Sequence, residues 1–434
     1  MAPLTRVLVV GAGGREHALV RRLLRSPRKP EVLAAPGNAG IARDRVECLP
    51  IAAEDVEGLV QAARARAVEL VVVGPEAPLV GGLVDALAEA GIAAFGPSRA
   101  AARLEGSKRF AKEMMQAVGI PTSGYEVLGS RQDALEAIAG HRYPIVLKAD
   151  SLAAGKGVIV CPDEAAAREA VGTFFIERRF GDTEVVLEEF LEGEELSLLA
   201  VCDGQTAIPM APAQDYKRIH DGDEGPNTGG MGSYSPVPGF DREHAEALAL
   251  AVHQPIVDEM RRRGTPFHGV LYAGLMMTSD GPKVLEYNTR FGDPETQAVL
   301  SRLRSDILDL LEGSTRTGGL EGVEIEWSDE WAVTVVLASR GYPESSSVGD
   351  EIRGLRSIDS IEVEVLHAGT VERDGRVVTD GGRVLSVTGI GPTAAEAREH
   401  AYAAARRIQF DGKQMRSDIA ARAVDALDRC SPAE

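Results

Sequence analysis

The chain lacks the long apolar runs, cysteine pairs and basic clusters that mark several large classes of protein. No apolar run approaches the roughly 20 residues that a membrane-spanning helix needs. The four cysteines lie far apart without a C-x-x-C pair, which argues against a zinc site or a disulfide framework. The formal net charge of -19 argues against a surface shaped for nucleic acid. No signal region precedes the strand-like residues 7–10, so we expect a cytoplasmic protein with neither a membrane nor a nucleic acid partner.

The 434 residues suggest about three domains, and the first hundred alternate β-branched runs with helical stretches. This pattern predicts an open, mostly parallel α/β sheet. The predicted strands cover residues 6–10, 31–35, 47–51, 70–73 and 93–95. The helices predicted between them cover residues 15–25, 54–67 and 79–90.

The remaining chain changes in texture at about residue 105 and again at about residue 318. The middle part predicts a helix over 108–118, strands over 144–148 and 157–161, and a loop over 221–239 that is too rich in turn residues for a regular element. The last part predicts strands over 331–338, 360–366, 377–379 and 383–388 and a helix over 394–408, a small α+β domain without obvious chemistry. The expected domains are therefore 1–104, 105–318 and 319–434.

Three glycine-bearing turns follow predicted strands of the first domain, at residues 11–14, 36–40 and 74–78. The carboxyl ends of parallel strands form one rim of the sheet, where such folds bind ligands. Residues 13 and 14 open a helix, whose free N–H groups favour an anion. The dinucleotide fingerprint needs a third glycine where Glu16 stands, so a nicotinamide cofactor is disfavoured. Ordinary tight turns are the alternative interpretation.

Two segments of the middle domain have the composition of a nucleotide site. Residues 150–157, Asp-Ser-Leu-Ala-Ala-Gly-Lys-Gly, join two predicted strands, with Lys148 ending the first. Small residues let the backbone approach phosphate oxygens, and the lysines supply positive charge. The Walker A spacing is absent. The acidic segment 188–195 follows a strand and can offer groups to adenine and ribose, although each segment alone also fits a surface turn.

The sharpest cluster is Glu-Tyr-Asn-Thr-Arg-Phe-Gly-Asp-Pro-Glu at 286–295. In a strand, Glu286, Asn288 and Arg290 point to the same face. A carboxylate and an amide oxygen are hard ligands for Mg²⁺, and a guanidinium can stabilise a transferring phosphoryl group. Three such groups in one row are unusual for a core strand, so the cluster indicates phosphoryl chemistry.

Several stretches together resemble the phosphoribosylamine–glycine ligases, a family of ATP-grasp enzymes. The likeness covers essentially the whole chain, and it extends to His-Ala-Gly-Thr at 367–370 and Gly-Gly-Arg-Val-Leu at 381–385. The main stretches are Gly-Ala-Gly-Gly-Arg-Glu-His-Ala at 11–18, Pro-Gly-Asn-Ala-Gly at 36–40, Gly-Pro-Glu-Ala-Pro-Leu-Val at 74–80, Leu-Glu-Gly-Ser-Lys at 104–108, Gly-Pro-Asn-Thr-Gly-Gly-Met-Gly at 225–232 and Arg-Phe-Gly-Asp-Pro-Glu-Thr-Gln at 290–297.

The resemblance implies an ATP-grasp fold with a mobile lid over about residues 122–193. It also implies the ligation of glycine to 5-phosphoribosylamine with ATP, through glycyl phosphate. Glu286 and Asn288 would bind Mg²⁺ or Mn²⁺, while Arg290 and Lys156 would be catalytic. The implied ATP-binding residues are Lys108, Lys148, Ser151, Gly155, Gly157, Glu188, Leu191 and Glu195.

The two substrates are the only expected partners. The candidates for binding them are Gly13, Gly14, Asn38, Glu76, Asp215, Lys217, Arg218, Gly230 and Asp293. We expect the rim residues among them to take the 5-phosphate and the ribose of phosphoribosylamine. Departures from the family pattern are Ser151, where glycine is expected, and Tyr216, where histidine is frequent.

Some alternatives remain open from the sequence. Another ATP-grasp ligase, of the biotin carboxylase or D-alanine ligase type, shares the E-x-N-x-R pattern, and a non-catalytic nucleotide sensor could use the same fold. The sequence identifies no general base and leaves the oligomeric state open, with a monomer as the expectation.

Overall fold

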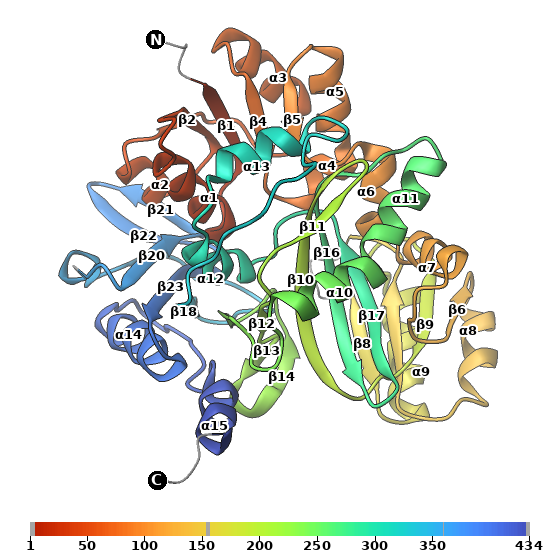
Figure 1. Cartoon of the computed structure of the whole chain (residues 1–434). Coiled ribbons are helices and arrows are strands. Elements are labelled where there is room, and N and C mark those ends of the chain that lie inside the picture. The colour runs from red at the N-terminus through yellow and green to blue at the C-terminus, as the bar shows by residue number, and fades with distance from the viewer. Residues whose placement is uncertain (1–4, 153–156, 359, 431–434) are drawn as a thin grey trace.

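The computed structural model describes residues 5–152, 157–358 and 360–430, shown in Figure 1. Its first unit is a five-stranded sheet of order β3-β2-β1-β4-β5, parallel throughout, as predicted. The strands are β1 (Arg6–Gly11), β2 (Glu31–Pro36), β3 (Glu47–Cys48), β4 (Leu70–Val73) and β5 (Ala93–Phe95). The helices are α1 (Gly14–Leu24), α2 (Ala39–Arg43), α3 (Val56–Ala65), α4 (Glu76–Gly81), α5 (Leu83–Glu89) and α6 (Arg99–Gly106).

Both faces of this sheet are buried, as expected for parallel strands flanked by helices. Val7 and Val9 of β1 pack in one hydrophobic cluster with α1, while Leu8 and Val10 pack in another with α3 and α5. The predicted helix over 79–90 is two helices, because Gly82 takes a left-handed conformation (φ 90°) between α4 and α5. The sequence reading missed α2 and α6.

The middle of the chain forms two four-stranded sheets, with β6-β9-β7-β8 lying beyond the edge strand β17 of β11-β10-β16-β17 (Figure 1). The first contains β6 (Tyr125–Leu128), β7 (Ile145–Ala149), β8 (Val158–Cys161) and β9 (Val185–Glu189), with α8 (Arg131–Ile138) and α9 (Glu164–Phe175). The second contains β10 (Glu194–Asp203), β11 (Ala207–Pro209), β16 (His268–Thr278) and β17 (Gly281–Asn288), with α7 (Lys108–Val118), α10 (Arg242–Val252) and α11 (Gln254–Arg262) nearby. The predicted helix over 108–118 is confirmed.

The carboxyl-terminal strands join strands from the middle of the chain in a sheet of order β12-β15-β18-β23-β20. Its strands are β12 (Gln214–Asp215), β15 (Gly232–Ser235), β18 (Trp331–Ala338), β20 (Val363–His367) and β23 (Arg383–Gly391). A smaller sheet holds β19 (Val348–Glu351), β21 (Thr370–Arg373) and β22 (Arg376–Asp380). The helices are α12 (Glu295–Arg302), α13 (Ile307–Ser314), α14 (Ala394–Arg407) and α15 (Ala421–Cys430). The larger sheet crosses the expected border at 318, and both domain borders stay predictions.

The prediction of an irregular loop over 221–239 was wrong. β13 (Arg218–His220) pairs with β14 (Glu224–Asn227), and β15 lies in the same segment. β15 pairs with β18, about a hundred residues along the chain, so its strand conformation depends on a distant partner rather than on local propensity. Among the described residues, no helix has the length and apolarity needed to cross a bilayer.

Candidate active site

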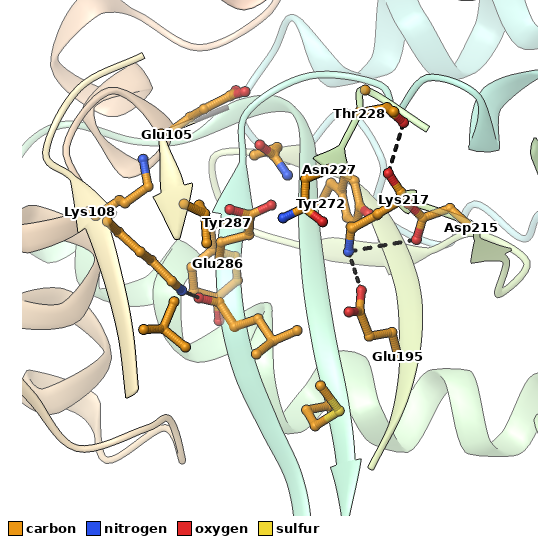
Figure 2. Close-up of a pocket in the computed structure, with 18 of the residues that line it drawn as sticks. Glu105, Lys108, Glu195, Asp215, Lys217, Asn227, Thr228, Tyr272, Glu286 and Tyr287 are labelled. Atoms are coloured by element: carbon orange, nitrogen blue, oxygen red, sulfur yellow. Dashed lines mark hydrogen bonds and ion pairs between the residues drawn. The ribbon is translucent and has the colours of Figure 1, made fainter. Parts of the chain in front are cut away.

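A cavity of about 950 Å³ lies between the two middle sheets and reaches the first and last parts of the chain. Figure 2 shows charged side chains from several elements converging on it. Most of the predicted site residues border it, namely Glu76, Lys108, Lys148, Ser151, Gly157, Glu188, Leu191, Glu195, Asp215, Lys217, Arg218, Glu286, Asn288, Arg290 and Asp293. The fold therefore brings together groups that the sequence spreads over more than two hundred positions.

Six predicted site residues are not among those that border the cavity. Four of them, Gly13, Gly14, Asn38 and Gly230, are described by the structure but do not line the cavity. Gly155 and Lys156 lie outside the described residues. The roles expected for these six residues stay predictions.

β17 presents Glu286 and Asn288 to the cavity, and Arg290 follows two residues beyond its end. Among the described residues, the Glu286 carboxylate has no hydrogen-bond partner and no ion pair within 4.0 Å. Burial raises the pKa of Glu286, but the positive charges of Lys217, Lys148 and Lys108 outweigh burial and hold this pKa below its usual range. An ionised carboxylate without a partner, surrounded by cations, is suited to a ligand that the protein itself does not supply.

A divalent metal ion fits this part of the cavity. No group of three or more His, Cys, Asp or Glu side chains that could hold a metal occurs in the part of the chain that the structure describes. Mg²⁺ does not need such a group, because it is commonly held by one or two carboxylates together with substrate phosphates. Glu286 and Asn288 supply two oxygen donors of the required kind.

A second buried carboxylate, from Glu188, holds Lys148 together with Lys112. Glu188 lies 3.0 Å from the Nζ atoms of both Lys148 and Lys112 and accepts a 2.6 Å hydrogen bond from Ser123. Burial raises the pKa of Glu188, but Lys148 and Lys112 hold it below its usual value. The Glu188 side chain thus faces the lysines, and its backbone lies in β9 between β6 and β7, so the role expected for Glu188 in ATP binding stays a prediction. Lys108 donates to the carbonyl oxygen of Ser151 at 3.2 Å.

Arg290 is held between two carboxylates, from Glu105 at 3.0 Å and Glu76 at 3.3 Å. Glu105 also accepts hydrogen bonds from the N–H and the hydroxyl of Thr289, at 2.7 and 3.1 Å. Burial lowers the pKa of Arg290, but these two carboxylates outweigh burial and hold this pKa above its usual value. The guanidinium therefore stays charged. The Glu76 carboxylate, which we predicted to bind ribose hydroxyls, faces Arg290 in this structure.

Lys217 points toward Glu195 and Asp215 (Figure 2), bonding to the first and lying 3.7 Å from the second. Burial raises the pKa of Asp215 to about 7, although the charge of Lys217 opposes the shift. Tyr272 lies beside this group and donates a 2.7 Å hydrogen bond to Glu295. The Lys217 ammonium thus lies among several carboxylates, and it can also bind the carboxylate of an amino acid.

The three turns of the amino-terminal rim are adjacent, as predicted. The N–H of Gly37 donates to the carbonyl oxygen of Gly11 at 3.1 Å, and the N–H of Gly74 donates to that of Val10 at 3.0 Å. Glu16 occupies the space between the turns, because a Cβ atom at Gly74 would lie only 2.1 Å from its carboxylate. Its carboxylate also accepts the N–H of Gly13 at 2.6 Å, so one predicted phosphate donor already has a partner.

Two other rim residues have structural partners. A Cβ atom at Gly14 would lie 2.6 Å from the amide nitrogen of Gln297, so this glycine permits close packing against α12. The Asn38 side chain caps α2 and donates 2.8 Å hydrogen bonds to the carbonyl oxygens of Ala12 and His367. It thereby joins the first and last parts of the chain.

Several cavity residues were not found from the sequence. They include Arg15, Glu105, Lys112, Tyr272, Glu295, Tyr342, Arg383 and Arg422. The last three belong to the carboxyl-terminal part, in which the sequence shows no obvious chemistry. Arg383 donates to the carbonyl oxygen of Asp293 at 2.7 Å and lies 3.2 Å from its carboxylate. Glu105 and Arg383 belong to stretches that carry the family resemblance, whereas nothing in the sequence distinguishes Lys112 from an ordinary helix lysine.

Three family models match the chain in order. They are the N domain, the ATP-grasp (A) domain and the C domain of phosphoribosylglycinamide synthetase, over residues 5–105, 106–296 and 332–422. Phosphoribosylamine–glycine ligase from Streptomyces coelicolor is 51% identical over 97% of this chain and 100% of its own length. The enzyme of the same name from Brucella melitensis is 48% identical over 97% of this chain and 98% of its own.

Solved structures show a similar fold. Phosphoribosylamine–glycine ligase from Thermotoga maritima is 36% identical and superposes with a TM-score of 0.81 over 96% of this chain and 100% of that one. Biotin carboxylase from Campylobacter jejuni, solved as a beta-gamma-ATP complex, has a TM-score of 0.72 at 14% identity, over 95% of this chain and 93% of that one. At such low identity the second likeness shows the fold alone.

Proposed function

The chain belongs to the phosphoribosylglycinamide synthetase family, and we propose that its central cavity joins glycine to 5-phosphoribosylamine through a glycyl phosphate intermediate. The protein is an ATP-grasp ligase of purine biosynthesis, a phosphoribosylamine–glycine ligase. The residue roles that follow belong to the proposal. The expected cytoplasmic location does too, and it is supported by the place of the reaction in purine biosynthesis.

The reaction needs an activated carboxylate, because the oxide of a carboxylate is a poor leaving group. A carboxylate oxygen of glycine attacks the γ-phosphorus of ATP, the bond to the β-phosphate oxygen breaks, and ADP leaves. The amine of phosphoribosylamine then attacks the acyl carbon of glycyl phosphate, inorganic phosphate leaves, and the nitrogen loses a proton. The protein mainly has to position these groups and neutralise charge.

Lys108 and Lys148 are the proposed partners of the ATP phosphates, and Arg290 is the proposed partner of the transferring phosphoryl group. Glu105 forms an ion pair with Arg290 and also accepts a hydrogen bond from the backbone N–H of Thr289. A cation fixed before the reaction stabilises developing charge without reorganising. Ser151, Gly155, Lys156 and Gly157 are proposed to cover the phosphates, with Leu191 and Glu195 at the nucleoside.

Glu286 and Asn288 would hold the divalent metal ion, Mg²⁺ or Mn²⁺. When bound, such an ion neutralises phosphate charge and orients the oxygens around the transferred group. The observation that supports the proposal most strongly is the Glu286 carboxylate, ionised and without a hydrogen-bond partner among the described residues, facing a cavity that contains Lys108, Lys148 and Arg290.

Asp215, Lys217, Arg218 and Asp293 are the proposed partners of glycine and the ribosylamine. The amino-terminal rim remains the proposed place of the 5-phosphate, through Gly13, Gly14 and Asn38, with Glu76 at the ribose and Gly230 nearby. An anion there has to share the Gly13 N–H with Glu16 or displace its carboxylate.

The test is an ADP-release assay with the purified protein, Mg²⁺ and ATP. ADP should form at the full rate only when both glycine and freshly generated phosphoribosylamine are present. ADP release with a different carboxylate instead of glycine would favour another ATP-grasp ligase. Binding of ATP without turnover under every substrate combination would favour a nucleotide sensor.

A further inference from the structure

A carboxyl-terminal segment packs against the hairpin that borders the substrate side of the cavity. The hairpin consists of β13 and β14, and Figure 1 shows α15 close to both strands. Its residues Arg218, Asp223 and Asn227 line the cavity. We call residues 216–227 the substrate hairpin and residues 416–422 the clamp.

Arg416 is the central contact between the two segments. It is 1% exposed, and one nitrogen donates to the carbonyl oxygen of Arg218 at 3.1 Å and to the carboxylate of Asp223 at 2.9 Å. Its other nitrogens donate to both carboxylate oxygens of Asp418, at 2.7 and 2.6 Å. Asp418 in turn accepts the N–H of Gly222 at 2.9 Å. Because a guanidinium has a fixed fork of donors, these bonds set the distance and the angle of the hairpin.

Tyr216 of the substrate hairpin also contacts the clamp through its side chain. Its hydroxyl accepts the N–H of Ala420 at 3.0 Å, and the guanidinium of Arg416 lies 4.8 Å from the centre of its ring. Tyr216 stands in the chain between Asp215 and Lys217, two of the proposed substrate residues. A shift of Tyr216 therefore moves both.

Each segment also holds a non-glycine residue in the left-handed conformation, Asp223 at φ 57° and Ala420 at φ 61°. Such conformations persist where the surrounding contacts over-determine them. Asp223 is bonded to Arg416 and Arg422, and Ala420 is bonded to Tyr216. The contacts between clamp and hairpin thus coincide with the two strained positions.

We propose that the clamp positions the substrate hairpin, and that Arg416 is a positioning residue for glycine and phosphoribosylamine that does not touch either substrate. The proposal rests on the proposed function, because the hairpin affects turnover only if Asp215, Lys217 and Arg218 bind the substrates. The proposed partners of the ATP phosphates, Lys108 and Lys148, lie on other elements, α7 and β7, so we expect the KM for ATP to depend on the clamp much less than the KM values of the two other substrates.

Arg416→Lys tests this, since lysine keeps the charge and loses the fork. Arg302→Lys is the matched control, because Arg302 is also buried and makes three bonds, to Glu330, Ser235 and Ser328, none of them to the clamp or the hairpin. For Arg416→Lys, the KM for glycine or for phosphoribosylamine should rise about tenfold or more while the KM for ATP changes less than about twofold. Arg302→Lys should leave all three KM values unchanged, even at an equal loss of thermal stability.

Unchanged KM values in a folded Arg416→Lys protein overturn the proposal, and so does an equal rise of all three. If Arg416→Lys does not fold, Tyr216→Phe removes only the hydroxyl bonded to Ala420 and carries the same two outcomes. A wild-type protein that releases no ADP with both substrates contradicts the proposed function. An active wild-type protein with unaffected clamp variants contradicts the clamp alone.

Discussion

Replacing Glu286 by glutamine tests whether this residue is a metal ligand or a structural carboxylate. Because the Glu286 carboxylate has no hydrogen bond or ion pair among the described residues, the equally sized amide breaks no contact. The change also ends the burial of a charge, which offsets part of the lost attraction to Lys108, Lys148 and Lys217. We therefore expect the free energy of unfolding to change by less than about 1 kcal/mol.

Catalysis should respond very differently. Without the carboxylate, the metal ion loses its only charged ligand among the predicted pair, and kcat should fall about 100-fold or more, a loss of about 2.7 kcal/mol at 1.36 kcal/mol per factor of ten. ATP without metal should bind at least as tightly as to the wild type, because a negative charge has left a cavity lined by lysines.

The assay combines ADP release over a range of Mg²⁺ concentrations, ATP binding in the presence of a chelator, and thermal unfolding. Glu312→Gln serves as the control, since Glu312 is a carboxylate paired with Arg28 away from the cavity. A large loss of stability in Glu286→Gln, with normal activity per folded molecule, would refute the reasoning and make Glu286 a structural residue.

Three further predictions follow from the buried charges. Glu105→Gln should lower kcat about 100-fold and the free energy of unfolding by about 2 kcal/mol, because Arg290 loses a carboxylate partner and shifts. An unchanged kcat would contradict this prediction. Lys112→Met should raise the KM for ATP about tenfold, or about 1.4 kcal/mol, because Glu188 loses one of its two lysines. A KM for ATP equal to that of the wild type would count against this prediction. Burial lowers the pKa of His367 from 6.5 to about 3. As the pH falls, this histidine is therefore protonated in the unfolded chain before it is protonated in the folded protein. The free energy of unfolding should decrease as pH falls below about 6.5, by up to about 1.4 kcal/mol per pH unit. Denaturant unfolding at several pH values should show a smaller slope for His367→Gln, and an identical slope would exclude this histidine as the cause.

The parallel amino-terminal sheet could be predicted because its strands are short β-branched runs bounded by turns, and local pattern decides such elements. Helices α2 and α6 could not be predicted in this way. Helix α2 is only one turn long and starts inside a Pro-Gly-Asn turn, where its cap Asn38 resembles an ordinary turn residue. β15 escaped because its partner strand β18 is distant in the chain, and local composition says nothing about such pairing.

The candidate site divides in the same way. Strand alternation is enough to place Glu286 and Asn288 on one face, whereas Arg290 lies beyond the end of β17 and reaches the cavity outside the strand. The support of Arg290 by Glu105 joins residues nearly two hundred positions apart, and it becomes visible only when α6 packs beside β17. The same holds for Arg383, which reaches Asp293 from strand β23, ninety positions along the chain.

The measurement that tests the central claim most directly follows oxygen from glycine into phosphate. Glycine whose carboxylate carries heavy oxygen is incubated with the protein, ATP, Mg²⁺ and freshly generated phosphoribosylamine, and the inorganic phosphate is analysed by mass spectrometry. Transfer through glycyl phosphate predicts that each phosphate released carries one heavy oxygen from glycine. Phosphate that carries none, formed at the same rate as the ligated product, would contradict the account.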